Sequence, residues 1–267
     1  MNTTVWMALL ATCGTWFVTA LGAAIVVFFR SPNQKILDFL LGFSAGVMIA
    51  ASFWSLLQPA IARAETAAGS PAYFVATSGF LLGALFLWGS DRIVAATQRR
   101  VNGCQEHPNA CRNRALALIL SITLHNIPEG LAIGVAFGAL QSAHHDTEAL
   151  MGAVTIALGI GLQNFPEGAA VSLPLRREGY SRRKSFFWGQ ASGMVEPIAG
   201  IVGAMLVVYV EKILPYALAF AAGAMILVAV HELIPECQKN QEEQPYFATM
   251  GIVLGFALMM LLDVALG

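Results

Sequence analysis

Apolar stretches of about 20 residues recur along the chain, which is the length of helix that crosses the hydrocarbon core of a bilayer. Hydrophobic residues make up 57% of the sequence and charged residues only 12%. In a soluble domain about a quarter of the residues are charged, so this chain has about half the usual share of charged residues. We therefore predict an integral membrane protein whose spans are helices, because lipid offers the backbone no hydrogen-bond partner.

The predicted fold is all-α, with eight transmembrane helices in a single transmembrane domain, residues 1–267. The first apolar stretch, which begins at Val5, is too long for a signal peptide and is expected to be a mature span. Glycines at four-residue spacing predict close helix packing; they are Gly42/Gly46, Gly79/Gly83, Gly130/Gly134/Gly138 and Gly189/Gly193. The spans are expected at 5–29, 36–61, 72–97, 114–140, 148–174, 185–210, 213–235 and 245–266.

Lysine and arginine gather at one end of these spans. Of 15 such residues, 13 lie in or beside the loops that follow odd-numbered spans, and only Arg63 and Lys212 lie elsewhere. Cytoplasmic loops carry the excess of positive charge. We therefore expect both termini outside the cytoplasm and the loop at 98–113 inside it. The short loops and the lack of a targeting segment favour a bacterial inner (plasma) membrane.

Two predicted spans carry the same polar motif. The pattern Asn-x-Pro-Glu-Gly occurs in the fourth span and again in the fifth, each time directly after a side chain that can donate a lone pair. In the fourth span, His125 and Glu129 are four residues apart and share one helix face. In the fifth span, the same holds for Gln163 and Glu167. A charge at mid-bilayer costs about 2.5–3.5 kcal/mol, so a shared ligand that offsets this cost is expected.

The donors of the paired motif suit a divalent transition metal. Pro128 and Pro166 cannot bond the carbonyls four residues before them, so each helix is expected to bend and expose backbone oxygen. Imidazole with carboxylate and amide oxygens favours zinc, iron, nickel or manganese over magnesium or calcium. The two carboxylates match a charge of 2+, which matters at low dielectric constant. The motif contains no thiolate, which argues against a Cu(I) site.

Other ionisable residues lie inside the spans. Glu196 precedes a proline in the sixth span, and His231 and Glu232 lie near the cytoplasmic end of the seventh. A zincin protease motif would need a second histidine at position 235, which is Pro235. A protease is therefore excluded on this motif.

The doubled motif, the eight spans and the outside termini resemble the ZIP family of divalent metal transporters, and most closely its GufA-type branch. The likeness is strongest between about residues 124 and 196. It implies an inverted repeat that relates spans one to three to spans six to eight around spans four and five. It also implies alternating access, uptake toward the cytoplasm and a homodimer.

The resemblance assigns three groups of side chains to metal. The transport site comprises His125, Glu129, Gln163, Glu167 and, from span two, Met48. An adjacent second position comprises Asn126, Asn164 and Glu196. His231 and Glu232 would assist at the cytoplasmic exit. Relatives often carry a carboxylate where this chain has Asn164, so its second position has a lower ligand charge.

Zinc is the expected cargo, followed by cadmium, iron, manganese and nickel, with no prosthetic group and no enzymatic activity. The lipid bilayer is an expected partner and nucleic acid is not, because no basic tract is present. A proton or other cation channel or carrier using the same carboxylates remains an alternative, as does a membrane metal sensor that does not transport. A membrane enzyme finds no support beyond the metal ligands.

Two loops carry further metal donors. The cytoplasmic loop has Cys104, His107 and Cys111, and the loop after the fourth span has His144, His145 and Asp146. The first set could receive metal that leaves the pore and the second could gather incoming metal. A polar, solvated loop is the preferred interpretation of both.

Overall fold

The computed structural model describes residues 2–28, 33–66, 70–102, 110–141, 147–239 and 246–266. Within these ranges the chain forms helices and no β-strand, as predicted. The long helices are α1 (Thr3–Phe28), α2 (Gln34–Ala51), α4 (Ala72–Asn102), α5 (Ala110–Gly138), α6 (Thr147–Arg177), α8 (Val195–Tyr209), α9 (Leu214–Val228) and α11 (Phe247–Leu266). The shorter segments are η1 (Ser52–Leu57), α3 (Gln58–Thr66), η2 (Ala139–Gln141), α7 (Arg182–Ala191), η3 (Ser192–Met194), η4 (Glu211–Ile213), η5 (Ala229–Leu233) and α10 (Ile234–Cys237).

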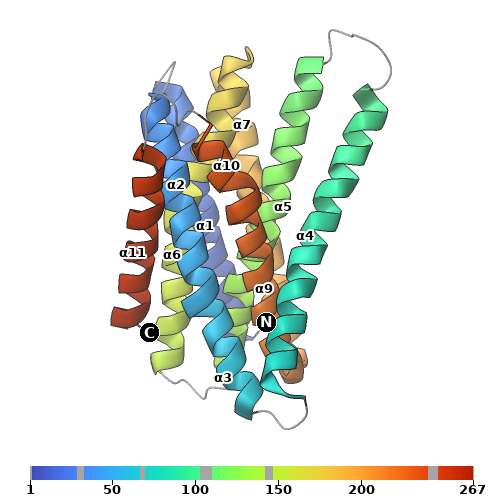
Figure 1. The fold of residues 1–267 in the computed structure, drawn as a ribbon, viewed down its shortest axis with the longest axis vertical. Helices are drawn as coiled ribbons and strands as arrows, with labels where there is room; N and C mark the ends of the chain where they lie inside the picture. Colours follow the sequence, from blue (N-terminus) through green and yellow to red (C-terminus); the bar gives the residue numbers. More distant parts are fainter. Residues whose placement is uncertain are drawn as a thin grey trace.

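Seven helical segments of the described residues are long and apolar enough to cross a membrane, and the chain is a multi-pass membrane protein. They are Thr3–Phe28, Gln34–Thr66, Ala72–Ile93, Thr147–Arg177, Arg182–Tyr209, Leu214–Cys237 and Phe247–Leu266. Each overlaps one predicted span. The remaining predicted span, 114–140, coincides with the 29-residue helix α5, which lies in the same bundle (Figure 1). The number of eight spans therefore stays a prediction, and the helices of the bundle are compatible with it.

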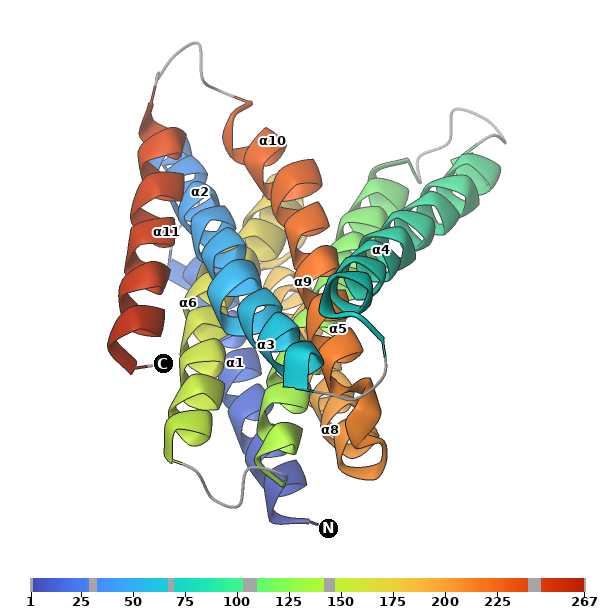
Figure 2. The same ribbon diagram turned by 60° about the horizontal axis from the view of Figure 1, so that its bottom comes forward.

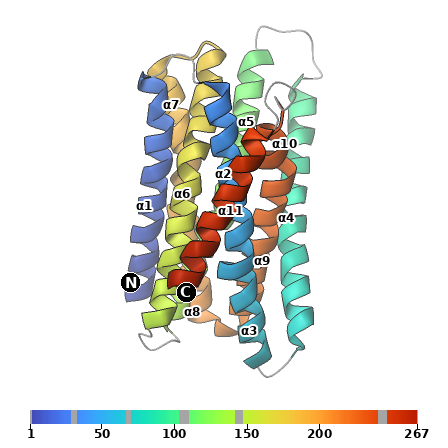
Figure 3. The ribbon, with the colours of Figure 1, turned by 60° about the vertical axis from the view of Figure 1, so that its left-hand side comes forward.

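The helices pack in two groups. One group consists of α1, α5, α6 and the α7–α8 segment, and the other of α2–α3, α4, α9–α10 and α11. Figure 2 shows α11, α2, α9 and α4 of the second group side by side in that order. Both marked termini lie at the same end of the bundle (Figure 3), which an even number of crossings requires.

Glycines allow four helix pairs to approach closely, because a side chain at these positions would meet the backbone of the neighbouring helix. The measure is the distance from an added Cβ to the nearest backbone oxygen. The pairs are α1–α6 (Gly22, 1.9 Å), α5–α8 (Gly134, 2.1 Å), α2–α11 (Gly46, 2.0 Å) and α4–α9 (Gly83, 1.9 Å). The predicted close packing at Gly46, Gly83 and Gly134 is confirmed.

These four pairs are related by the exchange that the predicted inverted repeat describes. Exchanging spans one to three with six to eight, and four with five, turns the α1–α6 pair into α8–α5 and the α2–α11 pair into α9–α4. The sequence of α2 and α9 follows the same relation. Residues 46–49 read Gly-Val-Met-Ile and residues 223–226 read Gly-Ala-Met-Ile, and each run leads into a π-helical turn, η1 or η5. Such turns inside α-helices frequently lie at functional sites.

Candidate metal centre

The two copies of the motif lie on neighbouring helices, α5 and α6, and their polar side chains are buried. The exposed fraction is 5% or less for His125, Asn126, Glu129, Gln163, Asn164 and Glu167. One direct contact joins the copies, since Gln163 Nε2 donates a hydrogen bond to Glu129 Oε1 at 2.6 Å. Both helices continue through their prolines, Pro128 and Pro166. The structure thus joins the two halves of the predicted transport site through Gln163 and Glu129.

Helix α2 closes one side of this centre through a residue that sequence reasoning missed. Ser44 Oγ donates to Glu167 Oε1 at 3.1 Å and to the backbone oxygen of Gln163 at 3.3 Å. Met48 lies one helical turn further along α2 and is completely buried. The four-residue spacing of Ser44 and Met48 was the available signal, because such residues share a helix face.

The centre holds several oxygen atoms that have no hydrogen-bond partner. Within the part of the chain that the structure describes, they are Asn126 Oδ1, Glu129 Oε2, Gln163 Oε1 and Asn164 Oδ1. A buried acceptor without a donor costs about 1–3 kcal/mol, and native structures contain few such atoms. All four are acceptors on one pair of helices. Carboxylate and amide oxygens are ligands for divalent cations, so the residues present fit a metal ion.

The segment η3 and the start of α8 hold the two asparagines. Asn126 Nδ2 donates to the backbone oxygen of Ser192 at 2.8 Å. Asn164 Nδ2 donates to both carboxylate oxygens of Glu196 at 2.9 Å, and Thr15 Oγ1 donates to Glu196 Oε2 at 2.6 Å. Glu196 is completely buried. The three residues of the predicted second position therefore lie together, on the α8 side of the centre.

A second cluster lies beside His125. Its Nε2 lies 2.5 Å from Glu232 Oε1, and one ligand atom from each of Asp91, His125 and Glu232 lies within 4.8 Å of the others. His231, the predicted companion of Glu232, is exposed. Sequence reasoning missed Asp91 on α4.

An available signal for Asp91 was internal similarity. Gly79, Gly83 and Asp91 have the same spacing as Gly251, Gly255 and Asp263. Ser55 Oγ donates to Asp263 Oδ1 at 2.6 Å near the opposite end of the bundle. The two segments with this spacing thus carry Asp91 near one end of the bundle and Asp263 near the other, and each carboxylate has polar neighbours.

A cavity of about 650 Å³ opens at the end of the bundle that carries the termini, and its wall includes Ser55, Glu148 and Asp263. It also includes Ala136 of α5 and Ile156 of α6. Both are about two turns from the motif on the side away from the Asp91 cluster.

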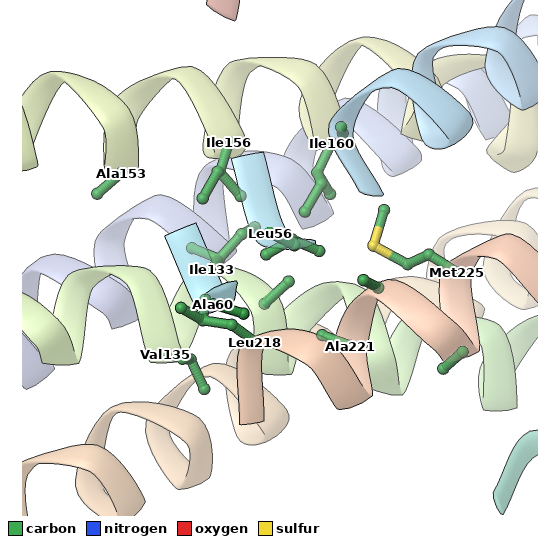
Figure 4. Packing of buried hydrophobic residues seen from close by; sticks show 14 of the residues in the cluster. Leu56, Ala60, Ile133, Val135, Ala153, Ile156, Ile160, Leu218, Ala221 and Met225 are labelled. Atoms are coloured by element: carbon green, nitrogen blue, oxygen red, sulfur yellow. The ribbon is translucent and has the colours of Figure 1, made fainter. Parts of the chain in front are cut away.

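An apolar layer separates this cavity from the centre. On α5, Ile133 lies between Glu129 and the cavity wall, and on α6, Ile160 lies between Gln163 and the wall. Figure 4 shows both isoleucines with Leu56 of η1 and Met225 of α9 in one buried cluster. None of the four is more than 1% exposed. The centre is thus closed toward the cavity.

Several predicted donors lie outside the described residues. They are Cys104, His107, His144, His145 and Asp146. Cys111 belongs to the first turn of α5. Their roles stay predictions.

Comparison with known proteins places the chain in a family. The family model of the ZIP zinc transporters matches residues 95–263. The zinc transporter ZIP11 of Homo sapiens is 40% identical, with all of this chain and 99% of the relative aligned. The zinc transporter ZIPB of Bordetella bronchiseptica is 38% identical over 97% of this chain and 81% of the relative. The zinc transporter GufA of Myxococcus xanthus is 36% identical over 93% and 94%. The chain belongs to the ZIP family.

Proposed function

We propose that this chain carries divalent transition-metal ions, zinc first, across a membrane and holds the ion between α5 and α6. The ligands are His125, Glu129, Gln163 and Glu167, with the thioether of Met48 beside them. The set of unpaired buried oxygens on the paired motif carries this proposal. Imidazole, carboxylate and amide oxygen together suit zinc better than an all-oxygen ion such as magnesium. The relatives are named zinc transporters, which points to a transporter rather than an enzyme.

The Asp91 cluster is the next position on the proposed route. His125 belongs to both groups, because it stands on the motif and its Nε2 lies beside Glu232. An ion can therefore pass from the centre to Asp91 and Glu232 while one ligand stays bound. His231, next in sequence to Glu232, is exposed, and we place it at the end of the route where the ion leaves the protein. The route leads toward the end of the bundle where most of the lysines and arginines lie.

The apolar layer supports a mechanism of alternating access. Leu56, Ile133 and Ile160 close the centre toward the cavity, so a second conformation that opens this side is required for an ion to enter. We assign the cavity to the external side and transport toward the cytoplasm. The group α1, α5, α6 and α8 carries the ligands and moves against the other group, which is also the dimer surface. The lipid bilayer surrounds this single transporter domain.

Zinc entry into proteoliposomes that contain the purified chain tests this function. Saturable entry that cadmium inhibits and magnesium does not is the expected result, since cadmium is accepted by the same donors. Zinc that binds at equilibrium without entering would show a metal sensor instead. Entry of protons in the absence of metal would favour a channel or carrier that uses the carboxylates as a relay.

Asp91→Asn and Glu232→Gln are each expected to slow zinc entry about tenfold, because each removes a negative charge, worth at least about 1.4 kcal/mol, from the next position on the route. Zinc affinity at the centre should change much less, because Glu129, Gln163 and Glu167 are intact. Initial rates and equilibrium binding separate the two effects. Glu236→Gln is the matched control, since this exposed residue of α10 pairs with Lys239. Unchanged initial rates in both variants would remove the Asp91 cluster from the route.

Both termini are proposed to lie outside the cytoplasm of a bacterial cell. The excess of positive charge at the opposite end of the bundle supports this orientation. A tag at either terminus should bind antibody on intact cells, and a tag within 103–109 should bind only after permeabilisation. The reverse pattern would invert the orientation.

A further inference from the structure

Both oxygens of the Glu196 carboxylate accept hydrogen bonds. Thr15 Oγ1 donates to Oε2 at 2.6 Å, and the amide nitrogen of Asn164 lies 2.9 Å from both oxygens. Thr19 Oγ1 lies 3.5 Å from Oε1. The side chain is completely buried. A metal ion that bound Glu196 would have to compete with these donors for the carboxylate oxygens.

The amide of Asn164 faces Glu196 with its nitrogen and therefore presents its oxygen elsewhere. That oxygen, Oδ1, is buried and has no hydrogen-bond partner among the described residues. Asn126 has the same arrangement, because its nitrogen donates to the Ser192 backbone and its Oδ1 is unpaired. The first turns of η3 and α8 thus hold both amides by nitrogen. Both oxygens remain available to a cation.

We propose that Glu196 is a positioning residue that orients the oxygen of Asn164, and that the centre holds one metal ion, not two. This inference rests on the function proposed above. With Glu196 engaged, the carboxylates that face the ion are Glu129 and Glu167, whose two charges match one divalent ion. A second ion would add two positive charges to a buried site whose other carboxylate, Glu196, is held by Thr15 and Asn164. A low-dielectric environment disfavours this excess of positive charge.

Zinc content of the purified chain in nanodiscs, measured by elemental analysis after gel filtration, tests the stoichiometry. The double variant Glu129→Ala/Glu167→Ala gives the zinc bound elsewhere, and its value is subtracted. One zinc ion per chain is expected for the wild type. Two are expected for Asn164→Asp, because two carboxylates then face each other without a donor between them. Two ions in the wild type, or one in Asn164→Asp, would overturn the proposal. No difference from the double variant would instead refute the proposed function.

Two substitutions of Glu196 distinguish a positioning residue from a ligand. In Glu196→Gln, the carbonyl oxygen can still accept from Asn164 and the amide nitrogen can donate to Thr15. Zinc affinity should therefore stay within about threefold of the wild type. Glu196→Ala leaves the Asn164 nitrogen only its longer bond to the Thr15 backbone oxygen, at 3.4 Å. Affinity should then fall about tenfold or more, the usual range for a lost hydrogen bond to a charged group.

A ligand role for Glu196 predicts a different pattern, in which Glu196→Gln loses as much zinc affinity as Glu196→Ala. The combination Asn164→Asp/Glu196→Gln adds a further check, because the engineered second ion needs both carboxylates. Its zinc content should return to one ion per chain. Two ions in this combination would also contradict the proposal. Competition with a chromophoric chelator gives the affinities for all of these variants.

Discussion

Glu129→Gln is expected to lower the initial rate of zinc entry about 100-fold or more. Glu129 is completely buried, and one of its oxygens accepts from Gln163 while the other is unpaired. The substitution keeps the size of the side chain and removes one negative charge next to a divalent ion. At an effective dielectric constant of about 20, a pair of unit charges 4 Å apart interacts with about 4 kcal/mol. Even a net loss of about 3 kcal/mol corresponds to more than 100-fold in affinity.

Initial rates in proteoliposomes, compared at equal amounts of inserted protein, measure this effect. Glu65→Gln is the control, since it makes the same chemical change at an exposed position of α3. It should transport at the wild-type rate. A Glu129→Gln variant that keeps more than about a tenth of the wild-type rate would show that this carboxylate does not bind the ion in transit. Gel-filtration profiles of both variants should match the wild type, because an amide can be buried at lower cost than a charge.

The helical fold could be predicted because span length and hydropathy are local properties of the chain. The helix ends were less accurate, since a helix can extend beyond the membrane: α4 continues to Asn102 and the α2–α3 segment to Thr66. Close approach at Gly46 and Gly83 was also predictable from four-residue spacing. Which helix each glycine meets was not, because this depends on the arrangement of the whole bundle. Gly22 belongs to none of the predicted pairs, yet it makes one of the closest contacts.

The metal centre, like the fold, could be predicted from the sequence only in part. The doubled motif identified His125, Glu129, Gln163 and Glu167, because helical periodicity places residues four apart on one face. Ser44 and Asp91 lie outside the doubled motif, and only packing reveals what they contact. Sequence could not show their partners.

Glu196 is a different case, since sequence reasoning placed a carboxylate near the motif and had no means to show its hydrogen bonds. The threonines that engage it, Thr15 and Thr19, lie about 180 residues earlier in the chain. Their spacing of four on α1 is common to many helices. Only the contact of α1 with α8 gives them a role, so the stoichiometry of the centre depends on packing.

The second large effect is expected for Gly22→Ala, which should lower the midpoint of thermal unfolding by about 4–8 °C and impair zinc entry. An added Cβ would lie 1.9 Å from the backbone oxygen and 2.8 Å from the backbone carbon of Phe165. Backbone atoms cannot rotate away as a side-chain tip does, so α1 must move off α6. Overpacking of this kind costs about 3 kcal/mol. Because Phe165 lies between Asn164 and Glu167, the displacement also reaches the metal ligands.

Gly14→Ala is the matched control on the same helix, because no atom lies within 4 Å of its added Cβ. Both substitutions favour the helix by about 1 kcal/mol, which alone would raise stability. At Gly14 this gain is unopposed, so the unfolding midpoint should stay constant or rise. At Gly22 the contact with α6 outweighs it by about 2 kcal/mol, equivalent to roughly 4–8 °C for a protein of this size. Equal midpoints for the two variants would mean that α1 and α6 are not in close contact. This result would also contradict the position of α1 that brings Thr15 to Glu196 on α8.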